Sequence, residues 1–291
     1  MTKCGYIATV GRPNAGKSSL LNWLLGEKIA MVSHKANATR KRSNIIVMHE
    51  DNQLIFIDTP GIHENEKLLN QYMLDEALKA MGDCDVILFL APVTDSLVYY
   101  EDFLNKNKKN IKHILLLTKI DFVSHNKVLE KIDLYKKHED KYEAIMPISI
   151  KKSTQKSDVL DLVTSFLPKH LPLYDTSIMT TDHLRDIYKE FIRESIFENI
   201  SDEIPYEADV LMNKIEEKPN IDVIKATIIV EKSSQKGMII GKNATTVKRI
   251  GKLARIKIET LSQKKAYLEL YVSVKRGWSK NKDGLKQLGY E

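Results

Sequence analysis

The sequence predicts an α/β domain built on a mostly parallel six-stranded sheet, followed by a smaller α+β domain. Up to Phe166, short apolar runs alternate with longer amphipathic stretches. This alternation is typical of a mostly parallel sheet that helices cover on both faces. The chain has 291 residues, which is more than one typical small domain needs and suits two domains.

Six apolar runs of strand length lie in the first part of the chain. They are Tyr6–Val10, Ile45–Met48, Leu54–Ile57, Val86–Ala91, Ile114–Leu117 and Ala144–Ile148. Between them, amphipathic stretches such as Leu68–Met81 and Lys127–Lys137 predict helices. Another helix is expected near Val159–Phe166.

Two prolines interrupt this pattern, at Pro168 and Pro172. Proline and turn residues between periodic segments indicate a boundary. We therefore expect a first domain over residues 1–172, a linker over 173–182 and a second domain over 183–291.

The second domain has a different order of elements. Leu184–Ile200 is predicted to form one helix and Ala226–Glu231 a strand. A helix over Ala244–Leu261 places five apolar residues on one face, namely Val247, Ile250, Ala254, Ile258 and Leu261. Ala266–Val274 alternates between apolar and polar residues, which is typical of a half-buried strand.

The charge of the chain is unevenly distributed. The net charge is +6, with +8 in residues 205–291 and −2 in residues 1–204. A localised basic excess points to nucleic acid or to an anionic surface as partner. The alternative is a solvated lysine-rich face, which composition alone does not exclude.

The apolar stretches and the cysteines bear on where the protein works. No apolar stretch is long enough to span a bilayer, and the first residues lack an apolar signal region. We therefore expect neither export nor a membrane span. Cys4 and Cys84 have no metal-type spacing, and we expect both to be buried free thiols.

The segment Gly11–Ser18 has the spacing Gly-x-x-x-x-Gly-Lys-Ser, between a predicted strand and a helix. Glycines let the backbone N–H groups of such a loop point at phosphate oxygens. Lys17 can reach the β- and γ-phosphates and Ser18 can ligate magnesium. A glycine turn that matches by chance is the less favoured alternative. The residues expected to bind nucleotide here are Gly11, Asn14, Ala15, Gly16, Lys17, Ser18 and Ser19.

Three further segments each follow the end of a predicted strand: Asp58–Gly61, Thr118–Asp121 and Ser149–Lys151. An acid at Asp58 can hold magnesium through water, and the Gly61 amide can sense a γ-phosphate. Singly, each segment is weak, but together and in this order they favour a nucleotide site at one edge of the sheet.

The base preferred by this site depends on Asp121. Its carboxylate can accept hydrogen bonds from guanine N1–H and the 2-amino group, which adenine does not offer. A buried site built for such a pair rejects the lacking analogue by on the order of 10⁴-fold. Thr118 and Lys119 would support the base, with the Lys119 stem packed over it. At the last strand, the Ile150 N–H would meet guanine O6, between Ser149 and Lys151.

These four segments resemble the translation-factor-like class of small P-loop GTPases. In that class the base motif usually has Asn-Lys-x-Asp, whereas this chain has Thr118 in place of asparagine. The asparagine ties the base loop to the phosphate loop. We therefore expect selectivity for guanine to persist through Asp121 and affinity to fall.

The resemblance also implies how hydrolysis would proceed. The residues expected in catalysis are Lys17, Thr39 and Gly61, and the magnesium ligands are Ser18, Thr39 and Asp58. Ile62 stands where related enzymes carry a glutamine that orients water, so we expect slow hydrolysis without a partner. Asn14 matches a potassium ligand of potassium-stimulated relatives, so K⁺ joins Mg²⁺ as an expected cofactor, with GTP as substrate.

The basic excess concentrates between Lys232 and Lys257, where eight residues are basic and none is acidic. Within it, Gly241-Lys242-Asn243-Ala244 lies between two predicted helices. A Gly-x-x-Gly loop in this position is the backbone clamp of KH domains, which hold about four nucleotides of single-stranded RNA. Here Ala244 takes the last glycine's place, so we expect altered geometry or weaker RNA binding. A plain basic helical hairpin is the alternative.

A GTPase domain followed by a type II KH-like domain resembles the Era family of bacterial GTPases. The segments that carry this resemblance are Gly11–Ser18, Asp58–Gly61, Asp202–Tyr206, Ser234–Lys242, Lys275–Trp278 and Leu285–Tyr290. Membership implies binding near the 3′ end of small-subunit (16S) ribosomal RNA, a role in 30S subunit assembly as a nucleotide-controlled checkpoint, and peripheral contact with the inner membrane in some settings. It also implies a cytoplasmic protein, and we expect a monomer. The residues expected to bind RNA are Lys236, Gly241, Lys242, Asn243 and Lys248.

Other functions remain open at this stage. One alternative is a nucleotide-gated interaction protein with little hydrolysis of its own. Another is a membrane-surface GTPase whose basic domain binds anionic lipid. A metabolic kinase is less favoured, because Asp121 and Ser149–Lys151 indicate guanine.

Overall fold

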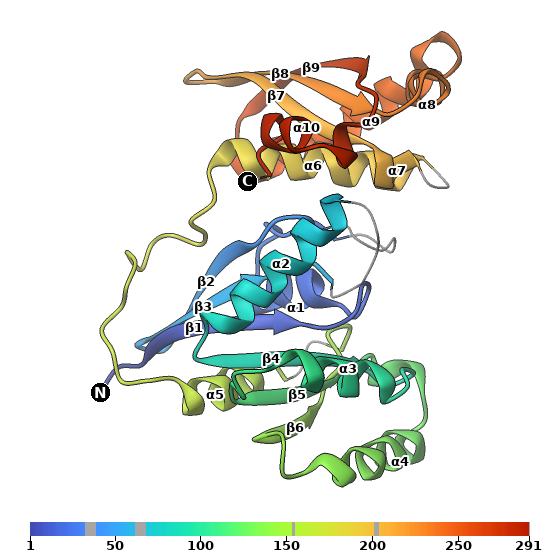
Figure 1. The fold of residues 1–291 in the computed structure, drawn as a ribbon. Helices are drawn as coiled ribbons and strands as arrows, with labels where there is room; N and C mark the ends of the chain where they lie inside the picture. Colours follow the sequence, from blue (N-terminus) through green and yellow to red (C-terminus); the bar gives the residue numbers. More distant parts are fainter. Residues whose placement is uncertain (33–38, 62–67, 153–154, 201–203, 291) are drawn as a thin grey trace. The chain divides into compact units, whose positions relative to one another are not determined.

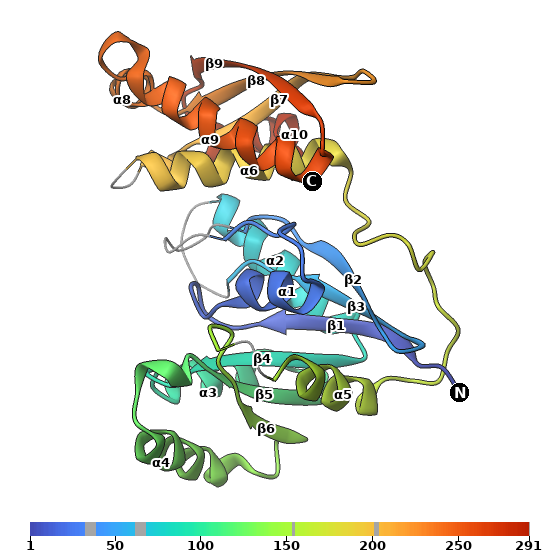
Figure 2. The same cartoon turned by 180° about the vertical axis from the view of Figure 1, so that it is seen from behind.

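The computed structural model describes residues 1–32, 39–61, 68–152, 155–200 and 204–290. They form two compact units. Of the described residues, 1–30, 39–61 and 73–181 belong to the first unit, and 31–32, 68–72 and 182–290 belong to the second. Figures 1 and 2 show the elements of each unit from opposite sides.

The first unit is built on a six-stranded sheet with the order β2-β3-β1-β4-β5-β6. Its strands are β1 (Cys4–Val10), β2 (Ser43–His49), β3 (Asn52–Asp58), β4 (Val86–Pro92), β5 (His113–Thr118) and β6 (Ala144–Pro147). β2 pairs antiparallel with β3, and the other pairs are parallel. The predicted α/β class and the six predicted strands are confirmed.

Helices cover both faces of this sheet (Figure 1). Helices α1 (Lys17–Leu25) and α5 (Lys156–Phe166) pack on one face. Helices α2 (Leu68–Gly82), α3 (Val98–Lys106) and α4 (His125–Tyr135) pack on the other. Because both faces are buried, the inner strands are almost continuously apolar, which is why their sequences were recognisable.

Two short 3₁₀ turns complete the first unit, Ile120–Phe122 after β5 and Lys136–His138 after α4. The segment after α5 then runs back along the sheet. The Cys4 N–H donates to the Pro168 carbonyl at 3.2 Å, and the Ile46 N–H donates to the Met179 carbonyl at 2.8 Å. The buried Gln53 side chain accepts from the Leu173 N–H at 2.8 Å. These bonds hold the segment against β1, β2 and β3.

The second unit contains a three-stranded sheet with the order β7-β8-β9. The strands are β7 (Asp209–Glu217), β8 (Ile221–Val230) and β9 (Lys265–Val274). β7 and β8 are antiparallel, whereas β8 and β9 are parallel.

Five helices accompany this sheet: α6 (Leu184–Asn199), α7 (Ile204–Glu207), α8 (Ser233–Ile240), α9 (Thr245–Ser262) and α10 (Lys282–Gln287). Short 3₁₀ turns lie at Lys242–Ala244 and Trp278–Lys280. Leaving aside the single-turn α7, the order helix–strand–strand–helix–helix–strand is that of the predicted type II KH-like fold. On α9, Ile250, Ala254 and Ile258 are fully buried, on the face predicted from their spacing.

The remaining sequence expectations concern thiols and membrane spans. Cys4 and Cys84 are buried free cysteines, as expected. Among the helices that the structure describes, none combines the length and the apolar character that a bilayer crossing requires.

Candidate nucleotide site and basic groove

The loop between β1 and α1 curls around the side chain of Lys17. Asn14 and Gly16 adopt positive φ angles of 62° and 107°, and these turn the backbone inward. The Lys17 Nζ donates to the carbonyls of Gly11 at 3.1 Å and Arg12 at 3.2 Å. The ammonium group is therefore held beneath the loop, where phosphate oxygens would approach it. Ala15 and Ser19 flank this turn, Ala15 being fully buried.

The environment of Lys17 disfavours its charged form. Burial lowers the pKa of the Lys17 ammonium to about 8; Asp58 raises the pKa and Arg12 lowers it. A negatively charged ligand would reverse this effect, because it would replace the water lost on burial with a counter-charge. The site therefore carries a buried cation that an anion would stabilise.

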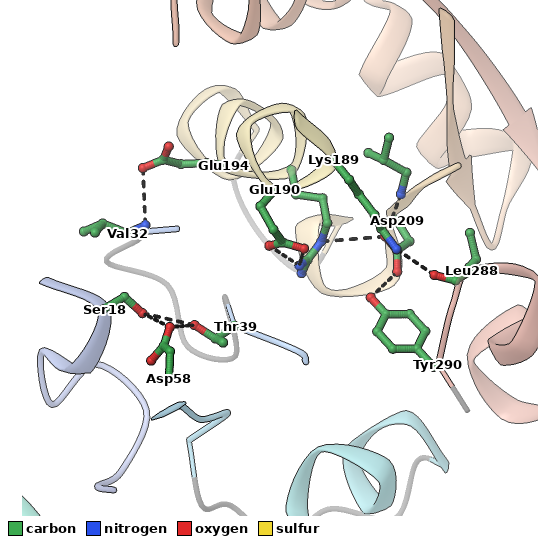
Figure 3. A network of polar contacts seen from close by, with 12 residues as sticks. Ser18, Val32, Thr39, Asp58, Lys189, Glu190, Glu194, Asp209, Leu288 and Tyr290 are labelled. Atoms are coloured by element: carbon green, nitrogen blue, oxygen red, sulfur yellow. Dashed lines mark hydrogen bonds and ion pairs between the residues drawn. The ribbon is translucent and has the colours of Figure 1, made fainter. Parts of the chain in front are cut away.

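Three side-chain oxygens, from Ser18, Thr39 and Asp58, converge at the start of α1 (Figure 3). The Ser18 Oγ lies 2.9 Å from the Asp58 Oδ2 and 3.1 Å from the Thr39 Oγ1. The Thr39 Oγ1 lies 3.4 Å from the same carboxylate oxygen. Two hydroxyls and one carboxylate are hard oxygen donors of the kind that Mg²⁺ prefers. The predicted magnesium ligands are thus brought together and fit that ion.

Gly61 lies against the phosphate loop. A Cβ at this position would come within 2.7 Å of the Pro13 nitrogen and 2.8 Å of the Pro13 Cγ. Only glycine permits so close an approach, and it leaves the Gly61 amide beside the loop that would hold the γ-phosphate. The next residue, Ile62, for which we expected no part in orienting water, lies outside the described residues, as do residues 33–38 before Thr39.

The segments expected to hold the base lie at the ends of β5 and β6. The Lys119 Nζ donates to the Asn14 carbonyl at 2.8 Å, and the Ser149 Oγ donates to the Asp121 Oδ1 at 2.8 Å. The Thr118 hydroxyl donates to the Ala15 carbonyl at 3.2 Å. The threonine therefore keeps one link between the base loop and the phosphate loop. Ile150 and Lys151 follow in the turn after Ser149.

One side-chain contact that fixes the phosphate loop was not predicted from the sequence. The Arg12 guanidinium pairs with Asp95 in a fork, with Nε 2.5 Å from Oδ2 and Nη2 2.6 Å from Oδ1. The Arg12 side chain also lies over the Tyr99 ring, 5.6 Å from its centroid, and the Lys131 Nζ donates to the Asp95 carbonyl. Asp95 follows β4 just as Asp58 ends β3, and this position was the available signal. Bidentate pairs fix geometry well.

In the second unit, the loop between α8 and α9 has the backbone of a tight clamp. Gly241 has a φ of 73°, and a Cβ there would lie 2.9 Å from the Thr246 nitrogen. Asn243 and Ala244 have φ angles of 54° and 58°. Ala244 therefore adopts the left-handed conformation that the missing glycine would adopt more easily.

A groove of about 430 Å³ lies between α9 and β9. Its lining residues are Val247, Lys248, Gly251, Lys252, Arg255, Tyr267, Leu268 and Leu270. Of the five predicted RNA-binding residues, Lys248 lines this groove. Lys242 and Asn243 are exposed on the clamp loop, while Lys236 is half-buried on α8.

No binding role was predicted from the sequence for Lys252, Arg255 or Tyr267, which line the groove. The spacing of Lys248, Lys252 and Arg255, at i, i+4 and i+7, is a signal that could have found the two basic residues, since such residues share one helix face. Together the groove residues form a floor of apolar side chains beside a row of cations.

Comparisons with known proteins agree with this geometry. Residues 6–119 match the family model described as "50S ribosome-binding GTPase", and residues 203–279 match the KH domain model. The chain is 50% identical to the GTPase Era of Campylobacter lari over 289 residues, which are 99% of each chain. It is 49% identical to the GTPase Era of Helicobacter pylori over 294 residues, covering 99% of this chain and 97% of the other.

Two solved structures match the whole chain. One is Era in complex with MgGDPNP and nucleotides 1506–1542 of 16S ribosomal RNA, with a TM-score of 0.95, 35% identity, and coverage of 100% and 99% of the two chains. The other is an Aquifex aeolicus Era variant bound to GDP·AlF4⁻, with the same TM-score and identity and 99% coverage of both. By identity and coverage over its whole length, the chain belongs to the Era family of GTPases and is a GTP-binding, GTP-hydrolysing protein.

Proposed function

We propose that this GTPase binds 16S ribosomal RNA near its 3′ end and acts in 30S subunit assembly as a nucleotide-controlled checkpoint. The observation that carries the proposal is the basic groove beside the clamp loop, formed by Lys248, Lys252 and Arg255. Cations along a cleft attract a phosphate backbone, and an apolar floor suits unpaired bases. The similar Era structure, which holds 16S nucleotides, supports the choice of RNA.

The proposal divides the chain into three parts. Residues 1–172 form the GTPase domain, residues 173–182 the linker and residues 183–291 the RNA-binding domain. The change of fold after Thr181 supports this division, although the first part of the proposed linker is hydrogen-bonded to the GTPase sheet. Binding of RNA is assigned to Lys236, Gly241, Lys242, Asn243 and Lys248, and to the two further cations of the groove.

Each residue of the nucleotide site has a distinct task. Lys17 neutralises the β- and γ-phosphates, and Asp121 selects guanine with the orientation set by Ser149. Ser18, Thr39 and Asp58 hold Mg²⁺, which when bound offsets the charge on the β- and γ-phosphate oxygens.

Gly61 offers its amide to the γ-phosphate, and the remaining nucleotide contacts come from the three segments that follow β1, β5 and β6. These contacts are Gly11, Asn14, Ala15, Gly16, Ser19, Thr118, Lys119, Ile150 and Lys151.

The most direct test of this function is to measure the affinity of the protein for RNA. Labelled RNA from the 16S 3′ end should bind more tightly with a GTP analogue than with GDP, as measured by fluorescence anisotropy. Lys242→Glu should weaken binding at least about tenfold, because it places a negative charge on a phosphate clamp. Lys282→Glu, an exposed lysine on α10, is the matched control and should change little.

A membrane-surface role makes the opposite prediction. Anionic lipid would engage scattered lysines, so the two charge reversals would weaken binding equally, and vesicles would compete with RNA. Equal effects of Lys242→Glu and Lys282→Glu would therefore overturn the RNA clamp. RNA affinity that is indifferent to nucleotide would overturn the checkpoint while leaving RNA binding in place.

We further propose that K⁺ stimulates hydrolysis through Asn14. The Asn14 carbonyl accepts a hydrogen bond from the Lys119 Nζ at 2.8 Å, which holds the Asn14 backbone within the phosphate loop. Hydrolysis should be faster in potassium than in sodium, and Asn14→Ala should remove that difference. Equal rates of the natural protein in both salts, measured by phosphate release, would contradict the assignment.

A further inference from the structure

Two tyrosines on β9 are half exposed although they belong to a regular strand. The exposed fraction is 55% for Tyr267 and 50% for Tyr271. Residues i, i+2 and i+4 of a strand point to the same face, so both rings lie on one face with Glu269 between them. The neighbours Ala266, Leu268 and Leu270 point to the opposite face, toward the helices.

This face of the sheet is open. Figures 1 and 2 show α6 and α9 on one side of the sheet, and no helix of the described second unit lies over the other side. On β8, the cross-strand neighbours of the two rings are Val223 beside Tyr267 and Thr227 beside Tyr271. β-Branched neighbours flank each ring and restrict its motion, which lowers the entropy lost when a ligand stacks on it.

The charge between the rings is balanced. The Glu269 carboxylate lies 3.0 Å from the Lys225 Nζ and also accepts from the Tyr271 hydroxyl. A carboxylate paired in this way repels a phosphate chain less than a free one. The face therefore presents two aromatic rings on a nearly neutral surface, which favours contact with bases rather than with phosphates.

The open face meets the basic groove at the β9 edge, where Tyr267 from this face and Leu268 and Leu270 from the helix-facing side all line the groove. Tyr267 lines the groove together with Lys248, Lys252 and Arg255. From Tyr267, the strand leads to Tyr271 four residues further, a step of about 13 Å. β9 is an edge strand, since it pairs only with β8 among the described strands, so a chain leaving the groove can pass over this edge without obstruction from a further strand.

We propose that Tyr267 and Tyr271 form a stacking platform for unpaired RNA bases beyond the groove. The proposal rests on the RNA-binding function given above and extends it to the open face of the sheet. Every base has a π-face, so stacking on an aromatic ring adds affinity with little sequence preference. The groove and loop hold the first nucleotides, and the platform takes bases from the strand that continues past Tyr267.

The test compares a long and a short RNA on the full chain. The long RNA is the 16S segment 1506–1542 bound by the similar Era protein, and the short one has about four nucleotides, the length that a KH clamp holds. Tyr267→Leu with Tyr271→Leu should weaken binding of the long RNA at least about tenfold. Tyr271→Leu alone should weaken binding of the long RNA but keep binding of the short RNA, measured by competition, within about twofold of the natural protein, because Tyr271 does not line the groove.

Two further variants separate stacking from a structural role. Tyr267→Phe with Tyr271→Phe keeps both rings and should retain the affinity for the long RNA. Ile256→Ala removes an exposed apolar side chain of α9 and should leave both affinities unchanged. Fluorescence of the buried Trp278 reports whether each variant remains folded.

Three results would overturn the platform. In the first, the leucine variant binds the long RNA as well as the natural protein. In the second, the phenylalanine variant is as weak as the leucine variant, which would assign the effect to the hydroxyl groups. In the third, Tyr271→Leu weakens binding of the short RNA as much as binding of the long one. If Lys242→Glu left both RNAs bound, the proposed clamp would fail instead, and the platform could still hold.

Discussion

Lys17 is a buried cation whose charge depends on the ligand that it faces. In the free protein its pKa is lowered to about 8 by burial. Phosphate groups favour the charged form, so the pKa of Lys17 rises when nucleotide binds. The favourable interaction is then complete below pH 8, and it is lost as the pH rises above 8 because binding must first protonate the amine.

We therefore predict that the Kd for GDP rises between pH 7 and pH 9, by about tenfold at pH 9. Calorimetry at pH 8.5 in two buffers of different ionisation enthalpy should show proton uptake on binding. Lys17→Arg is the control, since arginine stays protonated throughout this range. If the arginine variant takes up as many protons as the natural protein, the titrating group is not Lys17.

Ala244 is a second residue whose local energy can be tested. Its φ of 58° costs an alanine about 1–2 kcal/mol compared with glycine, partly offset by the greater unfolded-state entropy of glycine. We expect Ala244→Gly to stabilise the second unit by up to about 1 kcal/mol. Urea unfolding, followed by Trp278 fluorescence in a Trp23→Phe background, would measure it.

The matched control lies in the helix that begins directly after Ala244. Ala254 is fully buried within α9, so Ala254→Gly should destabilise the unit by about 1 kcal/mol. The two substitutions are chemically identical and should have opposite signs. A destabilisation by both would show that the strain at Ala244 is relieved in solution.

At the residue scale, the sequence predicted which chemical groups meet but not every contact between them. Ser18, Thr39 and Asp58 were predicted together because each is set by a motif position, and the structure brings them within hydrogen-bond distance. The contact between Arg12 and Asp95 was not predicted, because no motif spacing relates a loop residue to a carboxylate 83 positions away.

At the scale of the elements, strands with a clear pattern were predictable and irregular ones were not. β7 was missed because its register with β8 shifts between Met212 and Lys214. Such an irregularity breaks the two-residue alternation on which strand prediction depends. Helix α3 was missed because Tyr100 and Phe103 are the two residues that it buries, too few to produce a clear helical period.

The C-terminal segment is an element whose role comes from buried polar contacts. Tyr290 donates from its hydroxyl to the Asp209 carboxylate, and the Lys189 Nζ donates to the Leu288 carbonyl at 2.7 Å (Figure 3). Arg193, which is 1% exposed, approaches the same carboxylate at 3.7 Å. The end of the chain is therefore fastened to α6 and β7 through a buried acid.

We predict that Tyr290→Phe destabilises the second unit by about 1.5–3 kcal/mol, because a buried carboxylate loses a donor. The change should appear as a lower urea midpoint by Trp278 fluorescence. Tyr271→Phe, which removes a hydroxyl bonded to an exposed carboxylate, should leave the urea midpoint nearly unchanged, because water screens that contact. Equal shifts of the two variants would mean that the Tyr290 contact contributes no more than a surface one.

At the scale of the whole molecule, the charge distribution separates two kinds of binding. The first 204 residues carry −2 and the remainder +8, so RNA binding should depend on long-range electrostatics more than nucleotide binding does. This division was visible in the sequence. The alignment of Lys248, Lys252 and Arg255 along one groove was not, because it requires β9 to pack beside α9.

The salt dependence of RNA binding measures how many of these cations meet phosphates. For single strands, the slope of log K against log salt is about −0.7 for each phosphate neutralised. The three groove cations, with Lys242 on the clamp loop, therefore predict a slope of about −3. Lys252→Gln should make the slope less steep by about 0.7, because one counterion fewer is released, whereas Lys282→Gln on α10 should leave it unchanged. If both variants reduced the slope equally, the basic residues would act as a diffuse surface charge, and RNA would not follow the groove between α9 and β9.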